Sequence, residues 1–118
     1  MPPSQSDRVL FVQRALRLYQ LTPGTSGHIR RSDRLLACSL YDRGVSLDTI
    51  SAALLLTVAR RMFRSGNPLP PIASFHYVQP VIQELLHEPV DPDYLSHIAS
   101  RLATVVPDFA AAIAHQLS

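Results

Sequence analysis

Cysteine, lysine and long apolar runs are absent or nearly absent from this sequence. Cys38 is the single cysteine in 118 residues, so no disulfide can form within the chain, and a lone thiol is typical of a reducing compartment. Residues 1–7 have neither the basic nor the apolar region of a secretory signal. The longest apolar run, residues 52–59, is far shorter than the roughly 20 residues that span a bilayer. We therefore expect a cytoplasmic protein with no membrane segment.

All eleven basic residues are arginine, and they are distributed unevenly along the chain. Residues 1–64 hold ten arginines and four aspartates, for a net charge of +6, whereas residues 65–118 hold one arginine and five acidic residues, for −4. A basic half favours an anionic partner. The alternative is that codon usage placed arginine where lysine would serve, and that the charges only solvate helices. The acidic C-terminal half is expected to face a protein partner or solvent.

The apolar residues follow a helical repeat and give no sign of strands. Hydrophobic residues make up 47% of the sequence and charged residues 17%, which is typical of a globular domain and argues against disorder. No segment alternates apolar and polar residues between turn signals. We predict an all-α fold, a compact bundle of five or six helices in one domain, residues 7–118. A flexible tail, residues 1–6, is expected to precede it.

Capping residues and the apolar repeat together predict the helix bounds. Helices are expected over residues 7–21, 32–43, 46–65, 75–87, 91–105 and 107–117. In the first, Val9, Val12, Leu16 and Tyr19 recur at helical spacing and are expected on the buried face. Asp33 lies in the first turn of the second, where the helix dipole favours an acid, and Gly44 follows that helix directly as its C-terminal glycine. The third is apolar on much of its circumference and is expected to be the central buried helix. Ser46 is the predicted cap at its start, and Gly66 is expected to stop it. Pro80 predicts that the fourth begins either as a tight turn after Ser74 or only at the proline itself.

Residue types that hold metals or carry out catalysis are present, but without productive spacing. The five histidines, at positions 28, 76, 87, 97 and 115, include no His-x-x-x-His pair, and one cysteine cannot build a zinc cluster. Glu84 and Glu88 share a helix face, and a solvated surface explains them better than a paired acid site does. The sequence has no glycine-rich phosphate loop and no nucleophile–base motif. We expect no enzyme activity, no cofactor and no metal site.

Two arginine clusters are the candidate binding residues. One lies at the end of the third predicted helix, where cations also interact favourably with the helix dipole: Arg60, Arg61 and Arg64. The other lies at the start of the second predicted helix, where the dipole disfavours cations: Arg30, Arg31 and Arg34. Guanidinium groups in such clusters can bind phosphates through paired hydrogen bonds.

Residues 33–87 carry a longer pattern. Gly44 is followed by Ile50 and the pair Ala53-Leu54, and later by the segment Ser74-Phe75-His76-Tyr77-Val78-Gln79-Pro80-Val81-Ile82. This pattern resembles the helical DnaD-like domain of bacterial and phage replication-initiation proteins. The resemblance implies single-stranded DNA binding by the tyrosine-containing segment, and therefore by Tyr77, whose ring can stack on a base. The alternative is that the apolar residues of this segment pack a core.

These observations predict a small, non-catalytic accessory protein of DNA replication, recombination or a mobile genetic element. It would bind single- or double-stranded DNA through Arg30, Arg31, Arg34, Arg60, Arg61, Arg64 and Tyr77. The alternative is a protein–protein interaction module, an adaptor or inhibitor, that binds no nucleic acid. One contiguous face holding the six arginines favours nucleic acid, whereas scattered arginines beside an exposed apolar patch favour a protein partner.

Overall fold

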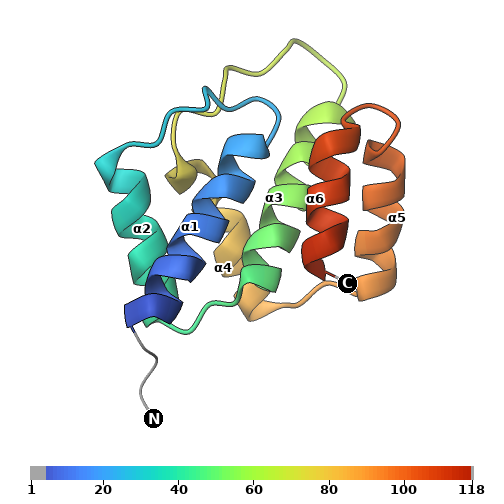
Figure 1. Ribbon diagram of the computed structural model, residues 1–118. Coiled ribbons are helices and arrows are strands. Elements are labelled where there is room, and N and C mark those ends of the chain that lie inside the picture. Colours follow the sequence, from blue (N-terminus) through green and yellow to red (C-terminus); the bar gives the residue numbers. More distant parts are fainter. Residues whose placement is uncertain (1–4, 118) are drawn as a thin grey trace.

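Six α-helices run alternately up and down a single bundle (Figure 1). The computed structural model describes residues 5–117. The elements in chain order are α1 (Gln5–Leu21), α2 (Arg31–Asp42), α3 (Leu47–Met62), the short 3-10 helix η1 (Phe75–Val78), α4 (Gln79–His87), α5 (Pro92–Leu102) and α6 (Pro107–Leu117). This confirms the prediction of an all-α bundle of five or six helices. Within residues 5–117, only Thr25 and Ile72 form a bridge with strand geometry.

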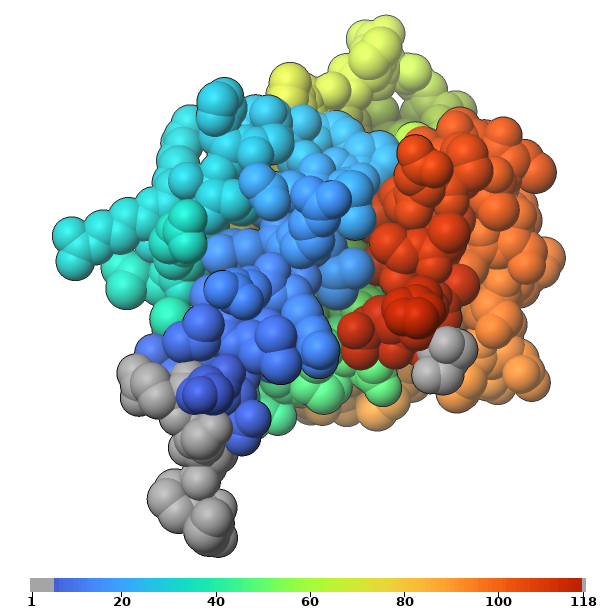
Figure 2. All heavy atoms as spheres, in the orientation of Figure 1, coloured from blue at the N-terminus to red at the C-terminus, as the bar shows by residue number. Residues whose placement is uncertain are grey.

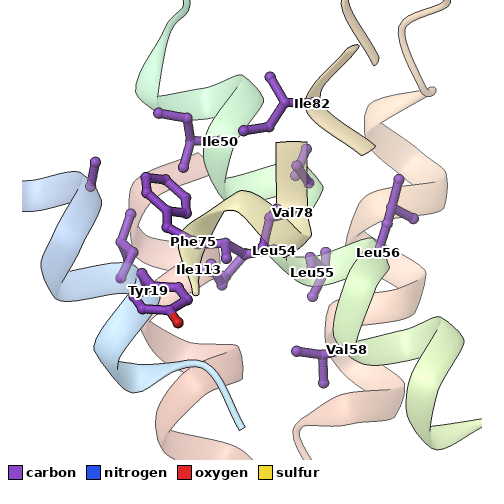
Figure 3. Packing of buried hydrophobic residues seen from close by; sticks show 14 of the residues in the cluster. Tyr19, Ile50, Leu54, Leu55, Leu56, Val58, Phe75, Val78, Ile82 and Ile113 are labelled. Atoms are coloured by element: carbon purple, nitrogen blue, oxygen red, sulfur yellow. The ribbon is translucent and has the colours of Figure 1, made fainter. Parts of the chain in front are cut away.

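Helix α3 is the central helix, as predicted. Every residue from Ile50 to Ala59 is buried, because the chain has no charged residue between Asp48 and Arg60 and α1, α4, α5 and α6 all pack around this segment. Figure 3 shows Leu54 of α3 beside Phe75 of η1 and Ile113 of α6. The buried hydroxyl of Thr57 donates to the carbonyl of Ala53 at 2.7 Å, so its burial leaves no hydrogen bond unmade.

The start of α3 and the end of α2 follow the predicted capping pattern. The Ser46 hydroxyl accepts a hydrogen bond from the backbone N–H of Thr49 at 3.1 Å, which satisfies one of the free donors of the first turn. Gly44 follows α2 with a φ of +80°, a left-handed conformation that residues with a Cβ rarely adopt. The chain therefore reverses between the two helices over very few residues.

The end of α3 is a correction to the predicted bounds. The helix ends at Met62, and not at residue 65 before Gly66. Phe63 is the C-cap, and its N–H donates to the carbonyl of Ala59 at 2.9 Å. The residues that follow, 63–66, are exposed, so no core contact favours continuing the helix there. Gly66 lies in the next loop with a φ of +114°.

Pro80 divides the fourth predicted helix into a tight turn after Ser74 and an α-helix, which is one of the two arrangements that the sequence predicted. Residues Phe75–Val78 form a 3-10 turn, and regular α-helix begins at Gln79 with Pro80 in its first turn. A proline is tolerated there because its missing N–H has no partner within the helix. The side chain of Ser74, the predicted cap, makes no capping hydrogen bond.

Helix α1 differs from its prediction at its start and in its buried face. Gln5 and Ser6 belong to the helix and not to a tail, whereas residues 1–4 of the predicted tail lie outside the described residues. Val9, expected on the buried stripe, is 49% exposed. Phe11 and Tyr19 are buried, and they lie on the side of α1 that meets α2 and η1. Figure 2 shows the outer surfaces of α1, α2 and α6 side by side on one face.

Candidate nucleic-acid interface

The two arginine clusters lie at the same end of the bundle. At this end α2, η1 and α6 begin and α1, α3 and α5 end, and the loops over residues 22–30 and 63–74 cross it (top of Figure 1). The two loops are joined there, because the N–H of Ile72 donates to the carbonyl of Gly24 at 2.7 Å. We call this the basic end and define it by its arginines, which are Arg30, Arg31, Arg34, Arg60, Arg61, Arg64 and Arg101.

A buried aspartate positions the first cluster. Asp33, in the first turn of α2, is completely buried. One of its carboxylate oxygens accepts the backbone N–H of Arg30 at 2.8 Å, and the other accepts the backbone N–H of Phe75 at 2.9 Å. The carboxylate therefore caps α2 and ties its N-terminus to η1 across 42 positions of sequence. These bonds fix the first turn of α2, and therefore the points at which the Arg31 and Arg34 side chains project into solvent.

Arg31 and Arg34 are free for an outside partner. Both are exposed, and neither side chain makes a hydrogen bond or an ion pair with any of residues 5–117. They stand in the first turn of α2, where the helix dipole disfavours cations. The fold does not use these charges, which is the arrangement expected of a surface that binds anions.

Arg60 is engaged within the protein. Its guanidinium makes two hydrogen bonds to the carboxylate of Glu84 on α4, at 2.9 and 2.6 Å. These hydrogen bonds, together with the positive charge, hold the pKa of Glu84 below its ordinary value. Both side chains remain about half exposed. Arg60 and Glu84 therefore form a surface ion pair between α3 and α4 in which the two charges offset each other. Of the predicted site residues, Arg60 is the least available to phosphate.

Arg61 connects the end of α3 to the loop that follows it and to η1, which carries the predicted tyrosine. One of its nitrogens donates to the Tyr77 hydroxyl at 3.0 Å, and another donates to the Pro70 carbonyl at 2.7 Å. The guanidinium carbon also lies 5.4 Å from the centre of the Tyr77 ring, a cation–π distance. Tyr77 nevertheless remains 45% exposed. The structure thus brings Arg61 and Tyr77 into contact and leaves part of the ring open to solvent.

Arg64 folds back on its own loop. It is exposed, and it donates one hydrogen bond to the carbonyl of Asn67 at 2.7 Å. Its remaining guanidinium donors have no partner among residues 5–117. The second predicted cluster is therefore only partly available: Arg64 keeps free donors, whereas Arg60 and Arg61 are held by other groups.

A second arginine–aromatic pair was missed by the sequence reasoning. The Arg101 guanidinium, in the last turn of α5, lies 4.2 Å from the centre of the Phe63 ring at the end of α3. Phe63 is 41% exposed. No local sequence pattern indicates this contact, because 38 positions separate Phe63 from Arg101. The helical repeat does place Arg101 near the end of α5. Because successive helices of the bundle alternate in direction, α3 and α5 end at the same end of the molecule, and this could have indicated the contact.

Charge is separated along the bundle. The basic end holds seven of the eleven arginines and three carboxylates: Asp33 is buried against backbone donors, Glu84 is paired with Arg60, and Asp108 is exposed in the first turn of α6. The other six acidic residues lie toward the opposite end, at Asp7, Asp42, Asp48, Glu88, Asp91 and Asp93. A separation of this kind orients an approaching anion toward the basic end.

Comparison with known proteins adds nothing to this description. No family model matches the chain, and no curated protein or solved structure matches it either. The resemblance of residues 33–87 to the DnaD-like domain therefore stays a prediction. Within residues 5–117, no group of three histidine, cysteine, aspartate or glutamate side chains is arranged to hold a metal ion. No helix in that range has the length and apolar character needed to cross a membrane.

Proposed function

We propose that this protein is a non-catalytic nucleic-acid-binding accessory domain whose basic end contacts the phosphate backbone. The observation that carries the proposal is the gathering of arginines from four separate segments, α2, α3, the loop after α3 and α5, at one end of the bundle. Arginine makes planar, paired hydrogen bonds to phosphate oxygens. The setting in DNA replication, recombination or a mobile element comes from the DnaD-like resemblance and forms part of the proposal.

Arg30, Arg31, Arg34 and Arg64 are assigned to phosphates, because each is exposed at the basic end and keeps free guanidinium donors. Tyr77 and Phe63 are assigned to bases, since each ring is about two-fifths exposed and carries an arginine against it. Exposed aromatic rings beside arginines favour single-stranded nucleic acid, whose unpaired bases can stack on them. A duplex offers the same phosphates but no free base faces.

Fluorescence anisotropy with labelled single-stranded DNA, duplex DNA and RNA tests the proposal. We expect binding that weakens with salt and prefers single strands. The double variant Arg31→Gln/Arg34→Gln should lower the magnitude of the log–log salt slope by about 1.4, the value for two lost phosphate contacts on a single strand. The matched control is Arg14→Gln/Arg43→Gln, which removes the same charge from exposed arginines outside the basic end. Equal loss of affinity in both double variants would show that only net charge matters and would reject the assigned site.

A protein–protein interaction module is the second candidate. Three large apolar side chains on α1 and α2, Val9, Leu10 and Leu35, are each between 43% and 56% exposed. Exposed apolar residues of this size suit a protein partner, although single ones are common on any surface. Absence of nucleic-acid binding at low salt, together with a partner whose binding is lost in Leu35→Ser, would favour this candidate over the first.

A further inference from the structure

A groove of about 770 Å³ runs between α5 and α6, away from the arginines assigned to nucleic acid. Residues of α3 and of the end of α4 complete its lining. The volume lies within the range of pockets that enclose small organic ligands. The groove is independent of the proposed function, because none of the seven arginines of the basic end, nor Tyr77, lines it.

The groove exists because the facing sides of α5 and α6 carry small residues. Ala99 on α5 and Ala103, the C-cap of that helix, lie one turn apart, and Ala111 and Ala114 lie one turn apart on α6. Their methyl groups are too short to fill the space between the two helices. Protein interiors are otherwise close-packed, so unfilled volume of this size is a distinct feature of the surface.

The chemistry of the lining is apolar with a single charge. Leucine, valine, alanine and proline side chains form most of the wall, and Asp48 at the start of α3 is the one charged lining residue among residues 5–117. One carboxylate oxygen of Asp48 accepts a hydrogen bond from the Gln116 amide at 3.1 Å. The other has no hydrogen-bond partner among residues 5–117. In the part of the chain that the structure describes, no arginine or histidine lines the groove, so these residues offer no counter-charge to an anionic ligand.

We propose that the groove binds a small apolar amine in its protonated form. The apolar body would lie between α5 and α6, against the alanines and against Leu95 on the inner wall. The ammonium group would donate to the free oxygen of Asp48. Charge complementarity selects this occupant, because a carboxylate or phosphate headgroup would meet only a like charge at that position. The hydroxyls of Ser96 and Ser100, also in the lining, can accept further N–H donors.

Isothermal titration calorimetry with three probes of one shape tests the proposal: 4-phenylbutylamine, 4-phenylbutan-1-ol and 4-phenylbutanoate. We expect affinity to fall in that order, and amide shifts in nuclear magnetic resonance spectra to map to residues of the groove. Equal affinity of the amine and the alcohol would overturn the assignment of the headgroup. Failure of all three to bind would overturn the site. If an amphipathic peptide then shifted the same amides, the groove would be a docking surface for a protein segment.

Two variants with matched controls separate the headgroup from the apolar body. Asp48→Asn should weaken the amine roughly fivefold, as expected for a partly exposed ion pair, and leave the alcohol unchanged. Asp93→Asn, the same change in an exposed first-turn aspartate outside the lining, should alter neither. Ala111→Leu should weaken the amine and the alcohol alike by filling the groove, whereas His97→Leu, exposed on α5 outside the lining, should not. Circular dichroism confirms that each variant folds, and an Asp48→Asn variant that binds the amine as tightly as the parent would reject the proposal.

Discussion

Removing the Asp33 carboxylate should destabilise the whole bundle, although the residue belongs to a surface helix. Its two oxygens accept backbone N–H groups from Arg30 and Phe75, and no other described group is bonded to either donor. In Asp33→Ala the start of α2 loses its cap. The buried N–H of Phe75 also loses its partner, in a site that water does not reach.

The magnitude follows from these two losses. Loss of a capping acceptor costs about 1 kcal/mol, and a buried donor left without a partner costs about 2 kcal/mol. We therefore expect the free energy of unfolding to fall by about 3 kcal/mol. For a chain of this length, that loss lowers the midpoint of thermal unfolding by roughly 10 °C. Asp33→Asn keeps one acceptor oxygen and should fall between the parent and the alanine variant.

Urea denaturation followed by circular dichroism measures the effect. Asp42→Ala is the matched control, since among residues 5–117 this exposed aspartate bonds only the Arg8 side chain, at 2.9 and 3.0 Å. Exposed ion pairs contribute little to stability. The control should therefore shift the midpoint far less than Asp33→Ala does. An Asp33→Ala variant as stable as Asp42→Ala would refute the account of how α2 is tied to η1.

Three further changes test other parts of the structure. Tyr19 is buried, and its hydroxyl has no partner among residues 5–117; burial, with the Asp33 charge second, raises its pKa. Tyr19→Phe should therefore keep or increase stability by up to about 1 kcal/mol in urea denaturation, and a loss of that size would show that the hydroxyl is bonded. Gly44→Ala should cost about 1 kcal/mol in the same assay, because nothing lies within 4 Å of the new Cβ and only the positive φ opposes it; no change would mean that the turn relaxes. The Arg60 hydrogen bonds lower the pKa of Glu84, so their contribution is complete above the ordinary glutamate pKa of about 4.3 and is lost as pH falls through the lowered value. Glu84→Gln should thus reduce the loss of stability on acidification, and an unchanged pH profile of unfolding would contradict the pairing.

Local signals predicted the fold because each one acts within a few residues. Ser46 caps α3 through a donor three positions away, and Gly44 ends α2 through its own backbone conformation. The uncharged run before Arg60 predicted the buried helix in the same way. The predictions failed where contacts between distant segments decide which side of a helix is buried. Val9 is apolar and has the helical spacing of a buried residue, but it faces solvent. Helix α2 instead covers the neighbouring side of α1, where the centres of the Phe11 and Tyr41 rings lie 5.2 Å apart.

The candidate site could be predicted only in part for the same reason. The arginine clusters are visible in the sequence, but their meeting at one end depends on the alternating direction of the helices. Their availability depends on distant partners, as with Arg60 and Glu84, which are 24 positions apart. Asp33 was identified as a favourable first-turn charge. Its bond to Phe75 follows from packing, and no spacing along the chain indicates it.

Chemical-shift mapping of a single-stranded oligonucleotide titration tests the central claim most directly. We predict that the largest amide and arginine Nε shifts fall at the basic end, around Arg31, Arg34, Arg64 and Tyr77, and that they diminish with salt. Residues at the opposite end, around Asp42 and Asp91, should be unaffected. Shifts confined to the α5–α6 groove or to the exposed face of α1, or no shifts at low salt, would contradict the account.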